Sequence, residues 1–250
     1  MPRAIVAGLS VALFLCLSPA PPAQEVLRGE VLIDLEPIFT AAEGVPYPHP
    51  IDMNTARNWA LEEAALFFSA MIYGWSFSYE PGERARGIAG GFALESRGAV
   101  RFGDPGFFAT DAEIRDGRLS LWADYRLTGP QKNRVRAWRA GLVRNLQATG
   151  YAALGEEAES GSAAPAAGEA AEAAEGRPAD WIASKRAALE DAAETGIRAL
   201  LRGRERNRPR EARGFIALEE FPRYFMSGGR WAVSARFRVE VSEIIPFAAY

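Results

Sequence analysis

Cysteine and histidine are almost absent from this 250-residue chain, which has one of each, Cys16 and His49. Cys16 lies in an apolar N-terminal segment, so the chain beyond it offers no thiol for a disulfide, a nucleophile or a thiolate metal site. His49 stands between Pro48 and Pro50 in a stiff connector, and no G-x-S-x-G motif accompanies it. We therefore predict no structural zinc site and no catalytic triad.

Other binding motifs are missing as well. Gly87, Gly90 and Gly91 do not lead from a strand into a helix, so no phosphate-binding loop is expected. No run has the Asp and Asn spacing of a calcium loop. Lysine occurs only at Lys132 and Lys185, and the net charge of −3 gives no reason to expect a nucleic-acid partner. We expect no catalytic residue, no cofactor and no metal ion.

Residues 1–23 have the composition of a secretory signal peptide. Arg3 supplies a positive charge, Ala4–Leu17 is apolar, and small residues and prolines follow. The apolar run is shorter than the ~20 residues that a membrane-spanning helix needs. Cleavage after Ala20 and cleavage after Ala23 both fit this pattern, and an uncleaved anchor is the alternative to either.

Cys16 is not expected to be lipidated, because the residue before it, Leu15, is large. No later stretch is long and apolar enough to span a bilayer, so we expect no transmembrane segment in the mature chain. These features predict a periplasmic or secreted protein.

An internal repeat is the main pattern in the rest of the chain. Ala60–Ala65 (ALEEAA) returns as Ala188–Ala193 (ALEDAA). Three further matches follow in the same order: Ala85-Arg86-Gly87 with Ala212-Arg213-Gly214, Ala93-Leu94-Glu95 with Ala217-Leu218-Glu219, and Gly117-Arg118 with Gly229-Arg230. We predict a duplication, with chance similarity in an alanine- and arginine-rich chain as the alternative.

Periodicity predicts the elements of the first copy. Residues 25–36 alternate as a strand, and Asn54–Gly74 is expected to be a widely apolar helix capped by Asp52 or Asn54. On that helix Leu61, Ala65, Phe68 and Ile72 share one face. Strands are then expected at Trp75–Tyr79, from Gly91 to Glu95 and at Gly117–Thr128, with a helix at Asn133–Tyr151. Asp104, Asp111, Glu113 and Asp116 are expected to lie in a loop.

Residues 155–179 form a stretch rich in alanine, glycine and glutamate, with no large apolar side chain before Pro178. Such a stretch cannot bury enough surface to offset the cost of ordering it, so we predict a flexible acidic linker, with a frayed alanine- and glutamate-rich helix within part of it as the alternative. The second copy is expected to follow with a helix at Ser184–Gly203, capped by Asp180. Strands are expected at Gly214–Phe221 and Arg230–Ile245.

The predicted fold class is α+β, with antiparallel strands, helices packed on one face and a duplicated helix–strand–strand unit. Its parts are a signal peptide (1–23), a first α+β unit (24–154), the linker (155–179) and a second, shorter copy (180–250) packed on the first.

Residues 25–128 contain an exported strand, an alanine-rich helix that ends at a glycine, and further strands. This order resembles the small secreted α+β domains of the flagellar T-ring protein and related bacterial lipoproteins. The resemblance rests on pattern and transfers no functional residue. The absence of a lipidation site and the presence of a second copy are departures from it.

The densest charge lies in the run RGRERNRPREAR at 202–213. The simpler interpretation of this run is a solvated hairpin between a helix and a strand. The functional alternative is contact with an anionic partner, either an envelope protein or an anionic envelope polymer, through Arg202, Arg204, Arg206, Arg208 and Arg210.

Acid–base catalysis by two carboxyl groups is the one catalytic chemistry that the sequence leaves open. The repeat offers two candidate pairs, Glu62 with Glu190 and Glu95 with Glu219. Solvated helix faces are the preferred explanation of Glu62 and Glu190. We therefore predict an exported, non-enzymatic binding or structural protein of the periplasm or cell envelope, with a periplasmic hydrolase as the alternative.

Overall fold

The structure is a computed structural model that describes residues 25–35, 52–82, 90–140, 143–153, 178–202 and 209–246. In chain order its elements are β1 (Val26–Asp34), α1 (Met53–Ile72), β2 (Trp75–Glu80), β3 (Gly91–Ser96), β4 (Phe107–Arg115), β5 (Arg118–Arg126), α2 (Gly129–Ala140), β6 (Arg144–Ala153), α3 (Pro178–Arg202), β7 (Glu211–Leu218), β8 (Arg223–Ser227) and β9 (Arg230–Ile245). His49 and residues 155–177 of the predicted linker lie outside the described residues, whereas Pro178 and Ala179, expected to end the linker, already belong to α3.

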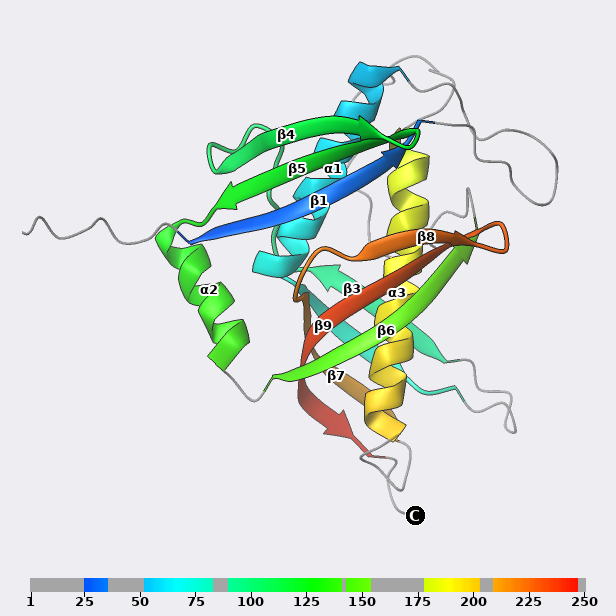
Figure 1. The fold of residues 1–250 in the computed structure, drawn as a ribbon. Coiled ribbons are helices and arrows are strands. Elements are labelled where there is room, and N and C mark those ends of the chain that lie inside the picture. Colours follow the sequence, from blue (N-terminus) through cyan, green and yellow to red (C-terminus); the bar gives the residue numbers. More distant parts are fainter. Residues whose placement is uncertain are drawn as a thin grey trace, which may run out of the picture.

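The strands form two sheets (Figure 1). One has the order β1-β5-β4, and the other has the order β3-β2-β7-β9-β6, with β8 paired to β9 beside this path. The pairings in both sheets are antiparallel. This arrangement confirms the predicted α+β class. The second sheet takes β2, β3 and β6 from the predicted first unit and β7, β8 and β9 from the predicted second unit, so the two segments share it.

The ends of α1 follow from its sequence. The Asp52 carboxylate accepts hydrogen bonds from the backbone N–H groups of Asn54, at 2.9 Å, and Thr55, at 3.1 Å. Asp52 is therefore the cap, and Asn54 lies inside the helix. After Ile72 the chain turns at Gly74, whose φ of +66° favours glycine. A Cβ there would lie 2.4 Å from the Ile216 carbonyl oxygen, so the stop also lets α1 approach β7 closely.

α1 lies at the centre of the fold, where it contacts β1, β5, β7, α2 and α3. Its bulky side chains Trp59, Phe67 and Phe68 are at most 1% exposed. Leu61 is only partly buried, although the helical pattern placed it with Phe68. The face turned to the core is centred on Ala60, Ala64 and Phe67 instead, because α1 has neighbours on several sides.

The predicted helix at Asn133–Tyr151 is wrong in its second half. α2 ends at Ala140 and β6 begins at Arg144, after which β6 pairs with β9 along its whole length. The buried side of β6 has small residues, and a Cβ at Gly150 would lie 2.1 Å from the Ala192 nitrogen of α3. Strand pairing and this close helix contact outweigh a local helical pattern.

Three further expectations are corrected. Asp111 and Glu113 lie in strand β4 rather than in a loop, because β4 pairs with β5. Strand β8 was not expected, and it forms by pairing with β9. Asp180 lies within α3, which begins at Pro178, so Asp180 is not its cap.

Two three-stranded arrangements are alike. β5 lies between β1 and β4, and β9 lies between β6 and β8. Each central strand follows a tight turn with a glycine at positive φ, +72° at Gly117 and +73° at Gly229. α1 contacts β1 and β5, and α3 contacts β6 and β9. The segments after the two helices differ, since β2 forms a hairpin with β3 whereas β7 pairs with β9. The duplication itself stays a prediction.

Candidate functional site

All the charged side chains of helix α2 are basic. Its charged residues are Lys132, Arg134, Arg136 and Arg139. The chain starts this helix with a capping box, in which the Gln131 side-chain oxygen accepts from the Thr128 N–H at 2.9 Å. We call these four residues and Arg97, which follows β3, the α2 surface.

A buried polar network fixes the base of α2. The Gln131 amide nitrogen donates to the Tyr73 hydroxyl at 2.9 Å and to the Tyr125 hydroxyl at 3.0 Å. Tyr125 in turn donates to Asp104 at 3.0 Å. Burial is the main cause that raises the pKa of Tyr125. The network joins the end of α1, the end of β5 and α2, so the basic side chains project from a rigid support.

Arg97 and Arg134 both lie over aromatic rings. The Arg97 guanidinium is 4.1 Å from the centre of the Phe215 ring, and that of Arg134 is 5.3 Å from the Tyr73 ring. Partial burial, followed by the charge of Arg134, lowers the pKa of Arg97 below its ordinary value, while Glu240 opposes the shift. The two cations are therefore close enough to repel each other. Within the described part of the chain, neither has a carboxylate at ion-pair distance.

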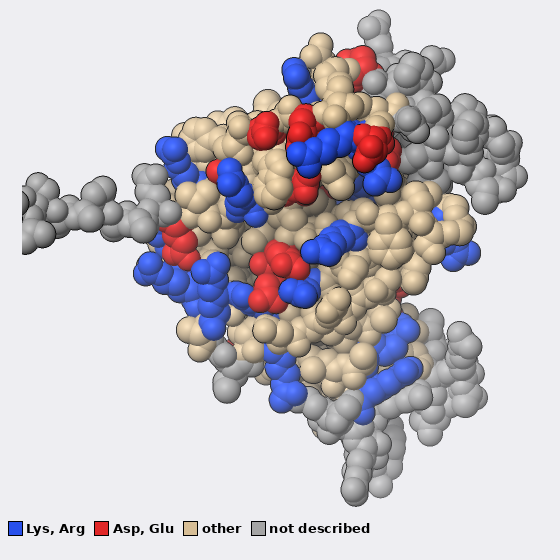
Figure 2. All heavy atoms as spheres, in the orientation of Figure 1, with Lys and Arg blue, Asp and Glu red and all other residues tan. Residues whose placement is uncertain are grey.

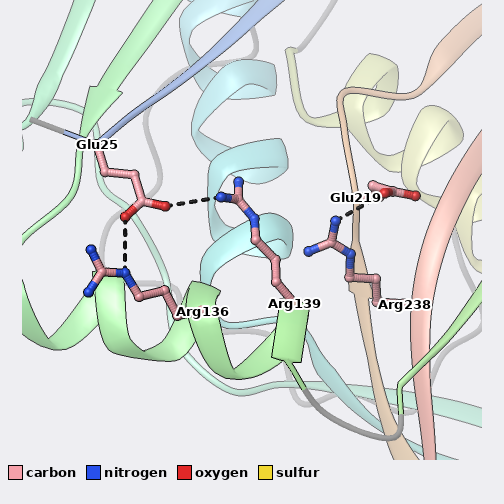
Figure 3. Close-up of polar contacts among 5 residues, drawn as sticks. All are labelled: Glu25, Arg136, Arg139, Glu219 and Arg238. Atoms are coloured by element: carbon pink, nitrogen blue, oxygen red, sulfur yellow. Dashed lines mark hydrogen bonds and ion pairs between the residues drawn. The ribbon is translucent and has the colours of Figure 1, made fainter. Parts of the chain in front are cut away.

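Arg136 and Arg139 share one carboxylate (Figure 3). Both side chains point from α2 toward Glu25, at 3.5 Å and 3.0 Å respectively. The side chains of Arg136 and Arg139 are 67% and 50% exposed, so solvent reaches them beside the ion pair. One carboxylate between two arginines leaves a positive excess at this end of the molecule.

The outer face of β9 continues from the α2 surface. Figure 3 shows the Arg238–Glu219 pair, at 3.0 Å, on the same side of the molecule as the α2 arginines. Arg236 pairs with Glu220 at 3.5 Å. In Figure 2 the α2 end of this face has a group of basic side chains, whereas the surface over β8 is mostly uncharged.

A second concentration of charge lies in the core between α1 and α3. The Lys185 ammonium donates to both carboxylate oxygens of Glu63, at 2.8 Å and 2.7 Å, and the two side chains are 2% and 3% exposed. The rings of Tyr224 and Trp231 lie 5.0 Å from the Lys185 nitrogen. The enclosed Tyr224 hydroxyl donates to the Lys185 carbonyl oxygen at 3.0 Å. A substrate cannot reach this pair from solvent, so its role is structural.

The sequence-predicted arginine run is only partly described. Arg202 is the final residue of α3 and Arg210 directly precedes β7, and both are exposed. Arg204, Arg206 and Arg208 lie outside the described residues, so the contact predicted for the run stays a prediction. The α2 surface was missed because the sequence was searched for the densest charge. A helix whose charges all have one sign was the signal that could have found it.

The candidate carboxylates are separate from one another. Glu62 lies on the exposed side of α1, and the partial burial of its carboxyl group is the one cause that raises its pKa. Glu190 pairs with Arg186 at 2.9 Å, and Glu219 pairs with Arg238. Glu95 is exposed on β3. Among these described residues, no contact joins the two members of either predicted pair.

The described residues contain neither a candidate metal site nor a candidate membrane-spanning helix. No three His, Cys, Asp or Glu side chains there gather closely enough to hold a metal ion. No helix in the described ranges is long and apolar enough to cross a membrane.

A protein-family model matches the chain in two overlapping stretches, residues 16–174 and 165–247. The chain belongs to this family. It is also similar to an uncharacterized protein of Treponema pallidum (strain Nichols), with 22% identity over 189 residues, or 76% of this chain and 69% of the relative. No solved structure is significantly similar to the chain. The resemblance to flagellar T-ring domains stays a prediction.

Proposed function

We propose that this protein is an exported, non-enzymatic binding component of the bacterial periplasm or cell envelope that holds an anionic partner on the α2 surface. The observation that supports it most is the single sign of charge on α2, strengthened by Arg97 beside Arg134. The envelope is where the predicted signal peptide would deliver the chain.

The charge of the α2 surface opposes that of the whole chain. The formal net charge is −3, so a polyanion gains nothing from the average field of the molecule. Within the described ranges, two acidic residues, Glu25 and Glu240, contact or influence the five cations of the α2 surface. Arginine binds phosphate and carboxylate through two parallel N–H donors, and stacking on a ring leaves those donors at the edge free. The surface is therefore suited to an oxyanion-bearing partner.

The acidic residues favour a role without catalysis. The Glu63 carboxylate is bound by Lys185 away from solvent, and Glu190 and Glu219 are held in ion pairs. A carboxylate acid–base pair needs two groups converging on one substrate bond, and these side chains lack that convergence. We also propose that the two similar three-stranded arrangements arose by duplication of one unit, a proposal that the function does not require.

Binding of the full chain to polyphosphate tests the proposed function, because this probe offers anionic oxygens and no other recognition feature. We expect binding that weakens with salt, since exposed charges are screened beyond about 10 Å at 0.1 M ionic strength. The double variant Arg97→Gln/Arg134→Gln should lose at least about tenfold in affinity, or about 1.4 kcal/mol. The matched control, which removes the same number of charges, is Arg28→Gln/Arg118→Gln, two exposed arginines on β1 and β5 that pair with Asp124 and Asp34.

Equal losses in the two double variants would contradict the proposal, because binding would then follow net charge alone. Retained affinity in the double variant of the α2 surface, together with a loss in Arg202→Gln/Arg210→Gln, would move the site to the sequence-predicted run. N-terminal sequencing of the protein from an envelope fraction tests export. A product that starts at Met1 in the cytoplasm would contradict it.

A further inference from the structure

Strands β8, β9 and β6 present two exposed aromatic side chains in one row. Phe225 on β8 and Tyr151 on β6 both stand opposite Ala232 on β9, so all three residues lie on the same face. Phe225 is 47% exposed and Tyr151 is 49% exposed, whereas Ala232 between them is fully buried. We call Phe225, Ala232 and Tyr151 the aromatic row.

Polar rows border the aromatic row on both sides. One consists of Arg223, Ser234 and Thr149, and the other of Ser227, Arg230 and Ala153. Neither row contains an acidic residue. In the described part of the chain, Arg223 and Arg230 take part in no ion pair. This part of the face therefore combines aromatic rings, hydroxyl groups and two uncompensated positive charges.

On the outer face of the first sheet, formed by β1, β5 and β4, charged side chains are paired with one another instead. On β1 and β5, Arg28 binds Asp124 at 2.8 Å and Arg118 pairs with Asp34. The Ser120 hydroxyl also donates to Glu30, at 2.6 Å. Charges on that face are neutralised by partners on the neighbouring strand, as expected for a face turned to solvent. Among the residues that the structure describes, the outer face of β6, β9 and β8 has no such pairing around the aromatic row.

The outer face of β9 connects the aromatic row with the α2 surface. From Ala232 the outward residues run through Ser234, Arg236 and Arg238 to Glu240, which influences Arg97. At about 3.3 Å per residue, this path is about 26 Å long. Glu220 and Glu219 neutralise its middle, so the uncompensated cations lie at its two ends. A ligand that contacts both ends must be extended.

We propose that the anionic partner is an acidic polysaccharide, which lies along the outer face of β9 with sugar rings on the aromatic row and acidic groups on the arginines at both ends. This proposal rests on the proposed function and names the class of its partner. A sugar ring has C–H groups on its faces and hydroxyls at its edge, so it fits aromatic rings flanked by Ser234 and Thr149.

A lipid surface suits this face less well. The tip of the β8–β9 hairpin consists of Ser227, Gly228, Gly229 and Arg230, with no apolar side chain to enter a bilayer. Phe225 and Tyr151 instead lie across the strands, behind that tip. An extended chain can contact both rings and the α2 surface together.

Binding of the full chain to four probes tests this inference. The probes are polygalacturonate, its methyl-esterified form, polyphosphate and phosphatidylglycerol vesicles. We expect polygalacturonate to bind more tightly than both its uncharged ester and polyphosphate. The double variant Phe225→Ala/Tyr151→Ala should weaken polygalacturonate binding about tenfold and leave polyphosphate binding unchanged. The matched control is Phe108→Ala, because Phe108 is an exposed aromatic residue, at 37%, on the outer face of β4.

The possible outcomes separate the two proposals. An unchanged affinity of the aromatic double variant for polygalacturonate would overturn the polysaccharide assignment. If polyphosphate still bound, the proposed anionic site on the α2 surface would remain supported. Polygalacturonate binding that depends on the rings, without polyphosphate binding, would support the sugar contact and contradict the simpler anionic site. Vesicle binding that depends on Phe225 and Tyr151, without polygalacturonate binding, would replace the polysaccharide by a lipid surface.

Discussion

The buried ion pair between α1 and α3 allows a quantitative prediction. In Lys185→Met a side chain of similar length loses its charge, while the Glu63 carboxylate stays 3% exposed without the cation that gives it two hydrogen bonds. Removing one partner of a buried pair costs about 3 to 5 kcal/mol, because the remaining charge is desolvated without compensation. Globular proteins have unfolding free energies of about 5 to 15 kcal/mol, so this loss is large.

The double variant Lys185→Met/Glu63→Leu should recover most of the lost stability. An apolar pair of similar volume has no charge to desolvate, and such replacements are neutral or stabilising by about 1 to 4 kcal/mol. Urea unfolding of the four proteins in this cycle measures the effect, with midpoints compared at constant m. The control is Arg28→Met, which breaks an exposed pair with Asp124 and should cost at most about 1 kcal/mol.

Two outcomes would refute this reasoning. A single variant that loses no more than Arg28→Met would show that the interior around Glu63 is effectively hydrated. A double variant less stable than Lys185→Met would show that the Glu63 side chain makes favourable contacts that do not need the ammonium group of Lys185.

Two further predictions concern burial and pH. Leu189→Ala should lower the unfolding free energy by about 2 to 5 kcal/mol, and Leu61→Ala by clearly less. The reason is that Leu189 is 2% exposed whereas Leu61 is only partly buried. Urea unfolding midpoints of both variants check this. Burial, followed by the charge of Glu63, raises the pKa of Tyr224 well above its ordinary value. The stability that depends on neutral Tyr224 is therefore complete below pH ~10 and is lost as the pH rises further, because the unfolded chain ionises first. The advantage of the native protein over Tyr224→Phe should shrink between pH ~8 and pH ~11, and an advantage that grows with pH would contradict the argument.

Elements with a strict period of two could be predicted from the sequence. The predicted strand Arg230–Ile245 matches β9, and Trp75–Tyr79 lies within β2. β6 was mistaken for a helix because its inward residues Ala148, Gly150 and Ala152 are small, and what decides their structure is the fit against α3. Such a contact is not encoded in the local pattern.

The candidate site shows the same limit. The charges of α2 are visible in the sequence, but Arg97 joins them only because β3 ends beside α2. The Glu63–Lys185 pair joins residues 122 positions apart, and the sequence marks neither of them as buried. Periodicity describes one element at a time, whereas these groups are brought together by the packing of two elements.

Strand β9 also sets an order of events during folding. It pairs with β6, β7 and β8, and all three precede it in the chain. Until β9 is available, β6 has no strand partner, because β9 is the strand to which it is joined in the second sheet. Bringing distant strands together costs loop-closure entropy before any strand pairing can stabilise the sheet. The second sheet should therefore form late and slowly. The first sheet needs no strand beyond Arg126, so it can form before the second while the chain is being synthesised.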